Sequence, residues 1–224
     1  MTERAFDLIL FDLDGTLVET APEILDAVND TLGQFQLSQV RLQQVRDWIG
    51  HGTVALLALA LADRSGMTLE AARASDLLRQ MVPVYDGFYQ KRCGTRSRLY
   101  PHVRETLQSL RAQGVKLAVV TNKEGRYTQA VLAAHQLGPV FDAVVCGDTF
   151  PTKKPDPAGL VHCLTRFGMA RERTLFVGDS SIDAATARNA GVPVWLLPYG
   201  YNMGLPIADC APDRMISDFS QILG

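Results

Sequence analysis

The chain has 224 residues, of which 47% are hydrophobic and 21% charged, as in ordinary globular proteins. This composition excludes a disordered, collagen-like or coiled-coil protein, and a chain of this length can bury a core without disulfides or a structural metal. The formal net charge of -2 provides no general attraction to nucleic acid or to an anionic membrane, so we expect neither as a partner. Any site for an anion must therefore be local.

The N-terminus and the cysteines favour a cytoplasmic protein. The first 16 residues are acidic, whereas a secretory signal would be basic, and their apolar run is short. The longest uncharged apolar stretch, residues 54–62, is far shorter than the ~20 residues of a membrane helix. The spacing of the cysteines does not resemble a disulfide framework, so we expect reduced thiols at four positions: Cys93, Cys146, Cys163 and Cys210.

Short aliphatic runs bounded by Gly, Asp or Pro recur along the chain and are typical of buried parallel strands. The predicted strands are residues 8–11, 117–120, 143–145, 175–177 and 194–197. Helix-length segments precede or separate the later strands, at residues 103–113, 126–135, 157–167 and 181–190. This alternation predicts an α/β fold, a doubly wound Rossmann-like parallel sheet.

Residues 17–94 break the alternation, because they carry helical patterns and no convincing strand. Pro22 occupies a favoured first-turn position, Gly52 precedes an apolar helical run, and residues 69–88 continue as helix despite Pro83. We interpret this segment as an inserted helical cap. The predicted domains are a core of residues 1–16 and 95–224 and a cap of residues 17–94.

Polar residues follow four of the predicted strands. They are Asp12 and Asp14, then Thr121 and Asn122, then Lys153 and Lys154, and finally Asp179 and Asp183. Each segment alone is compatible with an ordinary turn, strand end or helix cap. In open α/β sheets, however, ligands bind beyond the carboxyl ends of the strands, where all four segments would meet. Together they predict a binding site.

Three of these carboxylates suit a magnesium ion. Asp12, Asp14 and Asp179 would form a hard, oxygen-rich site of the kind that Mg²⁺ occupies next to a phosphate, with Asp183 orienting the ligands or binding through water. A calcium loop is excluded, because Leu17 occupies the position where such a loop needs glycine. We therefore expect Mg²⁺ as the cofactor.

The remaining groups suit phosphoryl transfer. Asp12 is the expected nucleophile, and Asp14 would protonate the leaving alcohol and then deprotonate the attacking water. Lys154 would neutralise phosphate charge, and Thr121 with nearby backbone N–H groups would hold phosphate oxygens. Asn122, beside Thr121, is a further candidate for binding the substrate.

The segments D-L-D-G-T, T-N, K-P and G-D-S-S-I-D, in this order, resemble the four motifs of the haloacid-dehalogenase-like phosphohydrolases. The resemblance implies an aspartate nucleophile, magnesium and a mobile helical cap on a Rossmann-like core, with the backbone carbonyl of Asp14 as a further metal ligand. The dehalogenases of the superfamily lack an acid–base aspartate at this position, which favours phosphoryl chemistry. Further segments, W-I-G-H-G, Y-P-H-V, V-V-T-N-K, K-K-P-D-P and Y-G-Y-N, resemble the bacterial phosphoglycolate phosphatase family.

The chain departs from this family at His51, where relatives often have Asn. We expect the cap segment around His51 to reach over the site, with the imidazole donating to a substrate carboxylate. The alternative is a solvated turn histidine. Arg46 and Lys123 are further candidates for binding a carboxylate, although each is also compatible with a solvated charge.

The sequence thus predicts a magnesium-dependent phosphatase for a small phosphomonoester, with 2-phosphoglycolate as the favoured substrate. Three alternatives stay open: a phosphatase for sugar phosphates or pyrophosphate, a phosphomutase, and a non-catalytic phosphate-binding protein. The predicted partner is a small-molecule phosphate ester. The sequence does not specify an oligomeric state.

Overall fold

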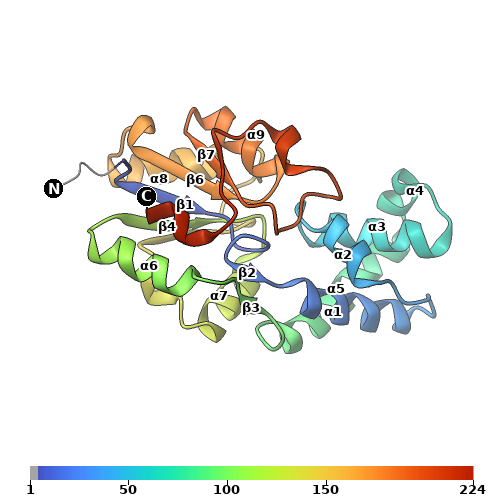
Figure 1. Ribbon diagram of the computed structural model, residues 1–224. Coiled ribbons are helices and arrows are strands. Elements are labelled where there is room, and N and C mark those ends of the chain that lie inside the picture. The colour runs from blue at the N-terminus through green and yellow to red at the C-terminus, as the bar shows by residue number, and fades with distance from the viewer. Residues whose placement is uncertain (1–4, 224) are drawn as a thin grey trace.

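The computed structural model describes residues 5–223 and is built on a six-stranded sheet, flanked by helices on both faces (Figure 1). The strand order is β5-β4-β1-β6-β7-β8, and every neighbouring pair is parallel. The strands are β1 Leu8–Phe11, β4 Lys116–Val120, β5 Ala143–Val145, β6 Thr174–Gly178, β7 Val194–Leu196 and β8 Arg214–Met215. The predicted α/β fold is confirmed, and the sequence patterns missed only the short edge strand β8 among these six.

The two faces of the sheet are covered by different helices. Side chains alternate along a strand, so Ile9 and Phe11 pack with α6 (Val103–Ala112) and α7 (Gly125–Ala134). Leu8 and Leu10 point the other way and share a cluster with α8 (Ala158–Phe167) and α9 (Ser181–Ala190). Both faces are buried, which explains why β1 reads as an unbroken apolar run.

The chain order places a crevice at the carboxyl end of β1. After β1 the chain forms β4 and β5 on one side of it and then returns to build β6, β7 and β8 on the other. Ligands bind in such folds where the strand order reverses. The ends of β1, β4 and β6 therefore frame the expected site.

Five helices lie beyond this edge of the sheet and form a cap (Figure 1). They are α1 Ala21–Gln34, α2 Leu42–Trp48, α3 Thr53–Ser65, α4 Leu69–Ala74 and α5 Asp76–Arg92. Their buried side chains form an apolar cluster of their own, joined from the core by Tyr127 and Tyr201. The helical pattern predicted over residues 69–88 is confirmed and forms two helices, α4 and α5. It divides at Ser75, whose side chain caps α5 by accepting from the Leu78 N–H, while Pro83 lies inside α5.

A two-stranded ribbon lies where the chain leaves the core and returns to it. Strand β2 (Val18–Glu19) pairs antiparallel with β3 (Arg98–Leu99). The expectation that residues 17–94 contain no strand is therefore wrong, because β2 is stabilised by a partner about 80 positions away in the chain. The domain boundaries at residues 16 and 94 stay a prediction.

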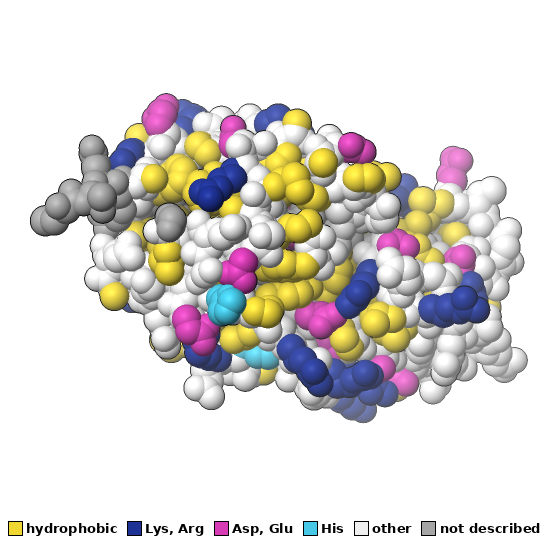
Figure 2. Space-filling view, in the orientation of Figure 1, with side chains coloured by type: hydrophobic (Ala, Val, Ile, Leu, Met, Phe, Trp, Pro, Cys, Tyr) yellow, Lys and Arg dark blue, Asp and Glu magenta, His cyan; other side chains and the backbone are white. Residues whose placement is uncertain are grey.

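Short 3-10 turns complete the core at Gly138–Val140, Arg171–Arg173, Ile207–Cys210 and Phe219–Leu223. The four cysteines are free. Among residues 5–223, no helix is long and apolar enough to cross a membrane. On the face shown in Figure 2, basic and acidic side chains are interspersed, in keeping with the small net charge.

Candidate active site

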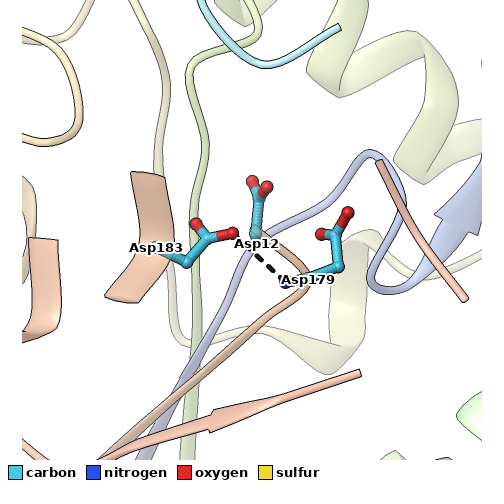
Figure 3. Close-up of side chains that lie close together, drawn as sticks. All are labelled: Asp12, Asp179 and Asp183. Carbon is cyan, nitrogen blue, oxygen red and sulfur yellow. Dashed lines mark hydrogen bonds between the residues drawn. The ribbon is translucent and has the colours of Figure 1, made fainter. Parts of the chain in front are cut away.

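Three carboxylates gather at the carboxyl edge of the sheet (Figure 3). Asp12 follows β1, and its backbone N–H donates to the carbonyl oxygen of Val177 on β6 at 3.0 Å. One oxygen each of Asp12, Asp179 and Asp183 lies within 4.8 Å of the others. The structure thus brings Asp12 together with two acids that lie more than 160 positions later in the sequence, as the strand-end argument predicts.

Asp179 is held by two hydrogen-bond donors and by close packing against two glycines, Gly15 and Gly200. Its carboxylate accepts from the Thr16 hydroxyl at 2.5 Å and from the Tyr201 backbone N–H at 2.6 Å. A Cβ atom at Gly15 or Gly200 would lie only 2.2 or 2.1 Å from its Oδ2. Burial raises the pKa of Asp179 well above its usual value, and the nearby carboxylates raise it further.

Asp183 is held in the first turn of α9. Its Oδ2 accepts from the Ser180 hydroxyl at 2.6 Å and from the backbone N–H groups of Ser180 and Asp179 at 3.1 and 3.2 Å. Ser180 and Asp183 form a capping box, so the same contacts start the helix. Because Oδ2 is fully used, Asp183 is suited to orient its neighbours through Oδ1.

Lys154 is the ammonium of this group. Its Nζ lies 2.7 Å from Asp183 Oδ1 and 2.9 Å from Asp12 Oδ1, and its side chain is 4% exposed. Burial by itself would lower the pKa of Lys154, but the charges of Asp12 and Asp183 raise it instead. The lysine is therefore a permanent positive charge between two acids.

Asp12 keeps one oxygen without a hydrogen bond. Its Oδ1 forms an ion pair with the Lys154 ammonium at 2.9 Å, and within residues 5–223 this buried atom has no hydrogen-bond partner. Burial raises the pKa of Asp12 to about 6, opposed by Lys154 and reinforced by Asp183. The carboxylate is poised to accept a cation or to attack an electrophile.

The side chain of Asn122 forms hydrogen bonds with the backbone of the loops around the site. Its Oδ1 accepts from the Lys154 backbone N–H at 2.8 Å, and its Nδ2 donates to the carbonyl oxygens of Lys154 and Gly50 at 3.0 and 2.9 Å. The backbone N–H of Thr121 donates to the carbonyl oxygen of Val145, and its hydroxyl accepts from the backbone N–H of Lys123 at 3.2 Å.

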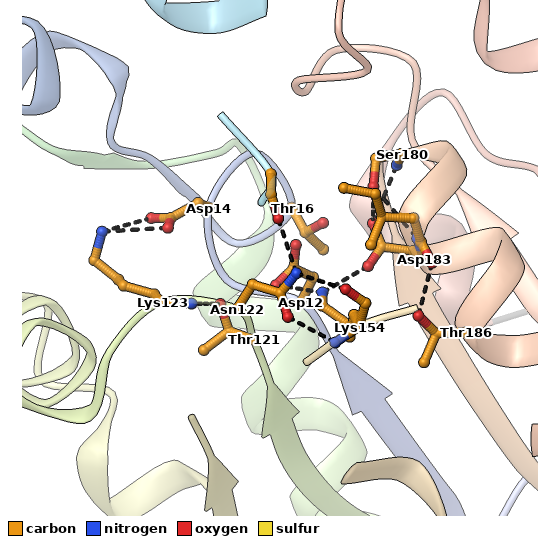
Figure 4. Close-up of polar contacts among 12 residues, drawn as sticks. Asp12, Asp14, Thr16, Thr121, Asn122, Lys123, Lys154, Ser180, Asp183 and Thr186 are labelled. Atoms are coloured by element: carbon orange, nitrogen blue, oxygen red, sulfur yellow. Dashed lines mark hydrogen bonds and ion pairs between the residues drawn. The ribbon is translucent and has the colours of Figure 1, made fainter. Parts of the chain in front are cut away.

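Asp14 stands apart from the three gathered acids. In Figure 4 its carboxylate faces Lys123, whose Nζ lies 3.2 Å from both oxygens. The Thr20 hydroxyl donates to Asp14 Oδ1 at 2.7 Å, and Lys123 also donates to the Tyr89 hydroxyl at 2.6 Å. Burial by itself would lower the pKa of Lys123, and the Asp14 carboxylate raises it instead. In this conformation Asp14 is bound to Lys123 and Thr20.

A cavity of about 50 Å³ lies between core and cap. Its lining combines polar core residues with cap side chains: Asp12, Asp14, Ile24, Ile49, Gly50, Gly52, Thr53, Leu56, Tyr85, Tyr89, Thr121, Asn122, Lys123 and Glu124. His51 is exposed and does not belong to this lining. The sequence patterns did not identify Thr53, Tyr85, Tyr89 and Glu124, because nothing local distinguishes the first three from ordinary helix residues or Glu124 from an ordinary helix cap.

Comparison with known proteins gives a consistent result. A model of the haloacid dehalogenase-like hydrolases matches residues 9–197. Phosphoglycolate phosphatases from Pasteurella multocida (strain Pm70) and Haemophilus influenzae (strain 86-028NP) are 41% and 40% identical, over 223 and 218 residues, and each alignment covers 97% of both chains. The crystal structure of a predicted phosphoglycolate phosphatase from Haemophilus somnus 129PT superposes with a TM-score of 0.92 at 37% identity, covering 98% of this chain and 97% of that one. The family predicted from the four motifs is confirmed: this chain belongs to the haloacid dehalogenase-like hydrolases.

Proposed function

We propose that this protein is a magnesium-dependent phosphatase that hydrolyses 2-phosphoglycolate to glycolate and inorganic phosphate. The observation that carries the chemistry is the buried Asp12 Oδ1, which accepts no hydrogen bond within residues 5–223 and lies 2.9 Å from the Lys154 ammonium. The relatives that are about 40% identical over nearly the whole chain support the choice of substrate.

The donor set fits a divalent cation. Three carboxylates face one ammonium in a buried site, so the group carries excess negative charge that burial makes costly. Asp12 and Asp179, with the backbone carbonyl of Asp14, would hold the ion, and Asp183 would orient them. All are hard oxygen ligands, which Mg²⁺ prefers. Bound there, Mg²⁺ would offset the charge of the phosphate as it approaches the carboxylate nucleophile.

Asp12 carries out the first step in this proposal. Its carboxylate attacks phosphorus, the bond from phosphorus to the glycolate oxygen breaks, and Asp14 gives its proton to that oxygen. The Lys154 ammonium and the Thr121 hydroxyl hold the other phosphate oxygens. An aspartyl phosphate and free glycolate result.

Asp14 serves the second step as a base. It takes a proton from water, the water oxygen attacks phosphorus, and the bond from phosphorus to the Asp12 oxygen breaks. Inorganic phosphate leaves and Asp12 is regenerated. The small cavity beneath the cap favours a small ester over a phosphate carried by a protein.

Phosphate release by the purified protein tests the proposal. The panel contains 2-phosphoglycolate, sugar phosphates, pyrophosphate and an aryl phosphate, each with Mg²⁺ or with EDTA. We expect a large kcat/KM preference for 2-phosphoglycolate, loss of activity with EDTA, and none in Asp12→Asn. Preference for another ester would overturn the assignment of 2-phosphoglycolate as the substrate. Phosphate binding without turnover would support the non-catalytic alternative, and stalling after one turnover would support a phosphomutase.

A further inference from the structure

Lys123 is a buried ammonium placed directly at the substrate cavity. Its side chain is 4% exposed, and it follows β4 two positions after Thr121. Among the described residues that line the cavity, Lys123 is the only one with a positively charged side chain. The proposed substrate carries a carboxylate in addition to its phosphate. A second anionic group bound in this cavity would therefore meet Lys123.

In this structure Lys123 is paired with Asp14, the residue that the proposed mechanism uses as its acid and base. Both oxygens of Asp14 lie 3.2 Å from Nζ, and Figure 4 shows the carboxylate turned toward the lysine. Because both Asp14 oxygens contact Lys123, proton transfer to the leaving oxygen requires the Asp14 carboxylate to move out of at least one of these contacts. This movement would weaken the ion pair of a buried ammonium, which is costly.

We propose that Lys123 recognises the carboxylate of the substrate, which replaces Asp14 as its counter-ion and thereby frees Asp14 for proton transfer. This inference rests on the proposed function. Lys123 is then a specificity-determining residue. The Tyr89 hydroxyl, which accepts from Nζ at 2.6 Å, holds the ammonium from the cap side during the exchange.

The other cations considered for this role are less well placed. His51 is exposed and outside the cavity lining. Arg46 pairs with Glu19 and lines a different pocket, beside Asp47. Lys154 already lies between Asp12 and Asp183. Among these four residues, only Lys123 is buried, lines the cavity and is paired with a group, Asp14, that moves in the proposed mechanism.

In this exchange the substrate carboxylate contributes to catalysis, by releasing Asp14, as well as to binding. An ester without a negative charge at that place cannot substitute for Asp14, so Lys123 continues to hold the acid–base group. Such an ester should suffer in kcat as well as in KM. A lysine that merely positions Asp14 would instead affect every substrate equally.

The test compares 2-phosphoglycolate with its carboxamide, an isostere that lacks the negative charge. The kcat and KM of both are measured for the wild type, Lys123→Met, Lys123→Arg and Lys116→Met. Lys116 is a matched control because it lies at the other end of β4, where its ammonium pairs with Asp142 on the surface. Circular dichroism checks folding, and Lys123→Gln replaces Lys123→Met if the latter does not fold.

We expect the wild type to prefer 2-phosphoglycolate, and we expect Lys123→Met to lower the ratio of the two kcat/KM values roughly 10- to 100-fold, as for the loss of a hydrogen-bonded charge. Lys123→Arg should retain more of the ratio, and Lys116→Met should retain it fully. An equal loss on both substrates in Lys123→Met would overturn the inference and leave the proposed function intact. A wild-type ratio near one would also overturn the inference, whereas a wild type that is inactive on both esters would overturn the proposed function.

Discussion

The side chain of Asn122 in the core donates a hydrogen bond to the carbonyl oxygen of Gly50 in the cap, at 2.9 Å. The same amide makes two hydrogen bonds with the backbone of Lys154, one through its oxygen and one through its nitrogen. A single residue at the end of β4 therefore fixes the loop that carries Lys154 and the loop that closes over the cavity. The T-N motif has a geometric reason here, because only an amide both accepts and donates in this way.

Asn122→Asp should lower kcat/KM on 2-phosphoglycolate about 10- to 100-fold, because the acid keeps the acceptor but loses both donors and faces two carbonyl oxygens. Steady-state phosphate release measures the change. Asn29→Asp is the matched control. Asn29 makes the same two-way contact with the Val40 backbone inside the cap, so its substitution should lower stability and leave kcat/KM unchanged. Equal kinetic losses in both variants would show that the loss is not local.

Glu23→Gln should destabilise the protein by about 1–3 kcal/mol. Glu23 is fully buried in α1, and its Oε2 accepts from the backbone N–H groups of Gly94, Arg96 and Ser97, where the chain returns to the core. The amide preserves the shape and removes the charge that strengthens these three bonds. Urea unfolding measures the change, with Glu70→Gln, on the exposed side of the cap, as control. An unchanged midpoint would contradict the assigned role.

Binding of Mg²⁺ should weaken as pH falls through about 6. Burial raises the pKa of Asp12 to about 6 against the opposing effect of Lys154, so below that pH a proton occupies the carboxylate that the ion needs. Calorimetry in two buffers of different ionisation enthalpy should detect proton release near pH 6. Asp12→Asn removes one of the titrating ligands and should reduce that release, and the remainder comes from Asp179, whose pKa burial also raises. Equal affinity at pH 5 and pH 7 would refute the assignment of Asp12 as a ligand.

The position of the site was predictable because it follows from topology. Asp12 and Asp179 end two apolar strands, and parallel strands bring their carboxyl ends to one edge. Helix α9 was predictable for a local reason, since Ser180 and Asp183 have capping-box spacing. In both cases the signal lies within a few residues of the feature that it specifies.

Local sequence patterns could not predict which cap residues contact the candidate site. Tyr89 packs among the apolar residues of α5 and contacts the site only because the cap folds over Lys123. The sequence made Lys123 a candidate for binding a carboxylate but left a solvated charge as the alternative, whereas the fold buries it against Asp14. These properties depend on how two units of the chain meet, which periodicity and spacing do not encode.

His51→Ala tests the remaining substrate-binding candidate in the cap. His51 is exposed on the turn between Gly50 and Gly52 and lies outside the cavity lining. Because the side chain of His51 is exposed and does not line the cavity, we expect kcat/KM to change less than about threefold on 2-phosphoglycolate and on its carboxamide alike. Steady-state kinetics on both esters measures this. A larger loss confined to 2-phosphoglycolate would mean that the turn moves inward when substrate binds, and it would make His51 a second group that reads the carboxylate beside Lys123. An equal loss on both esters would instead mean that the turn helps to close the cap, because closure excludes water from either substrate.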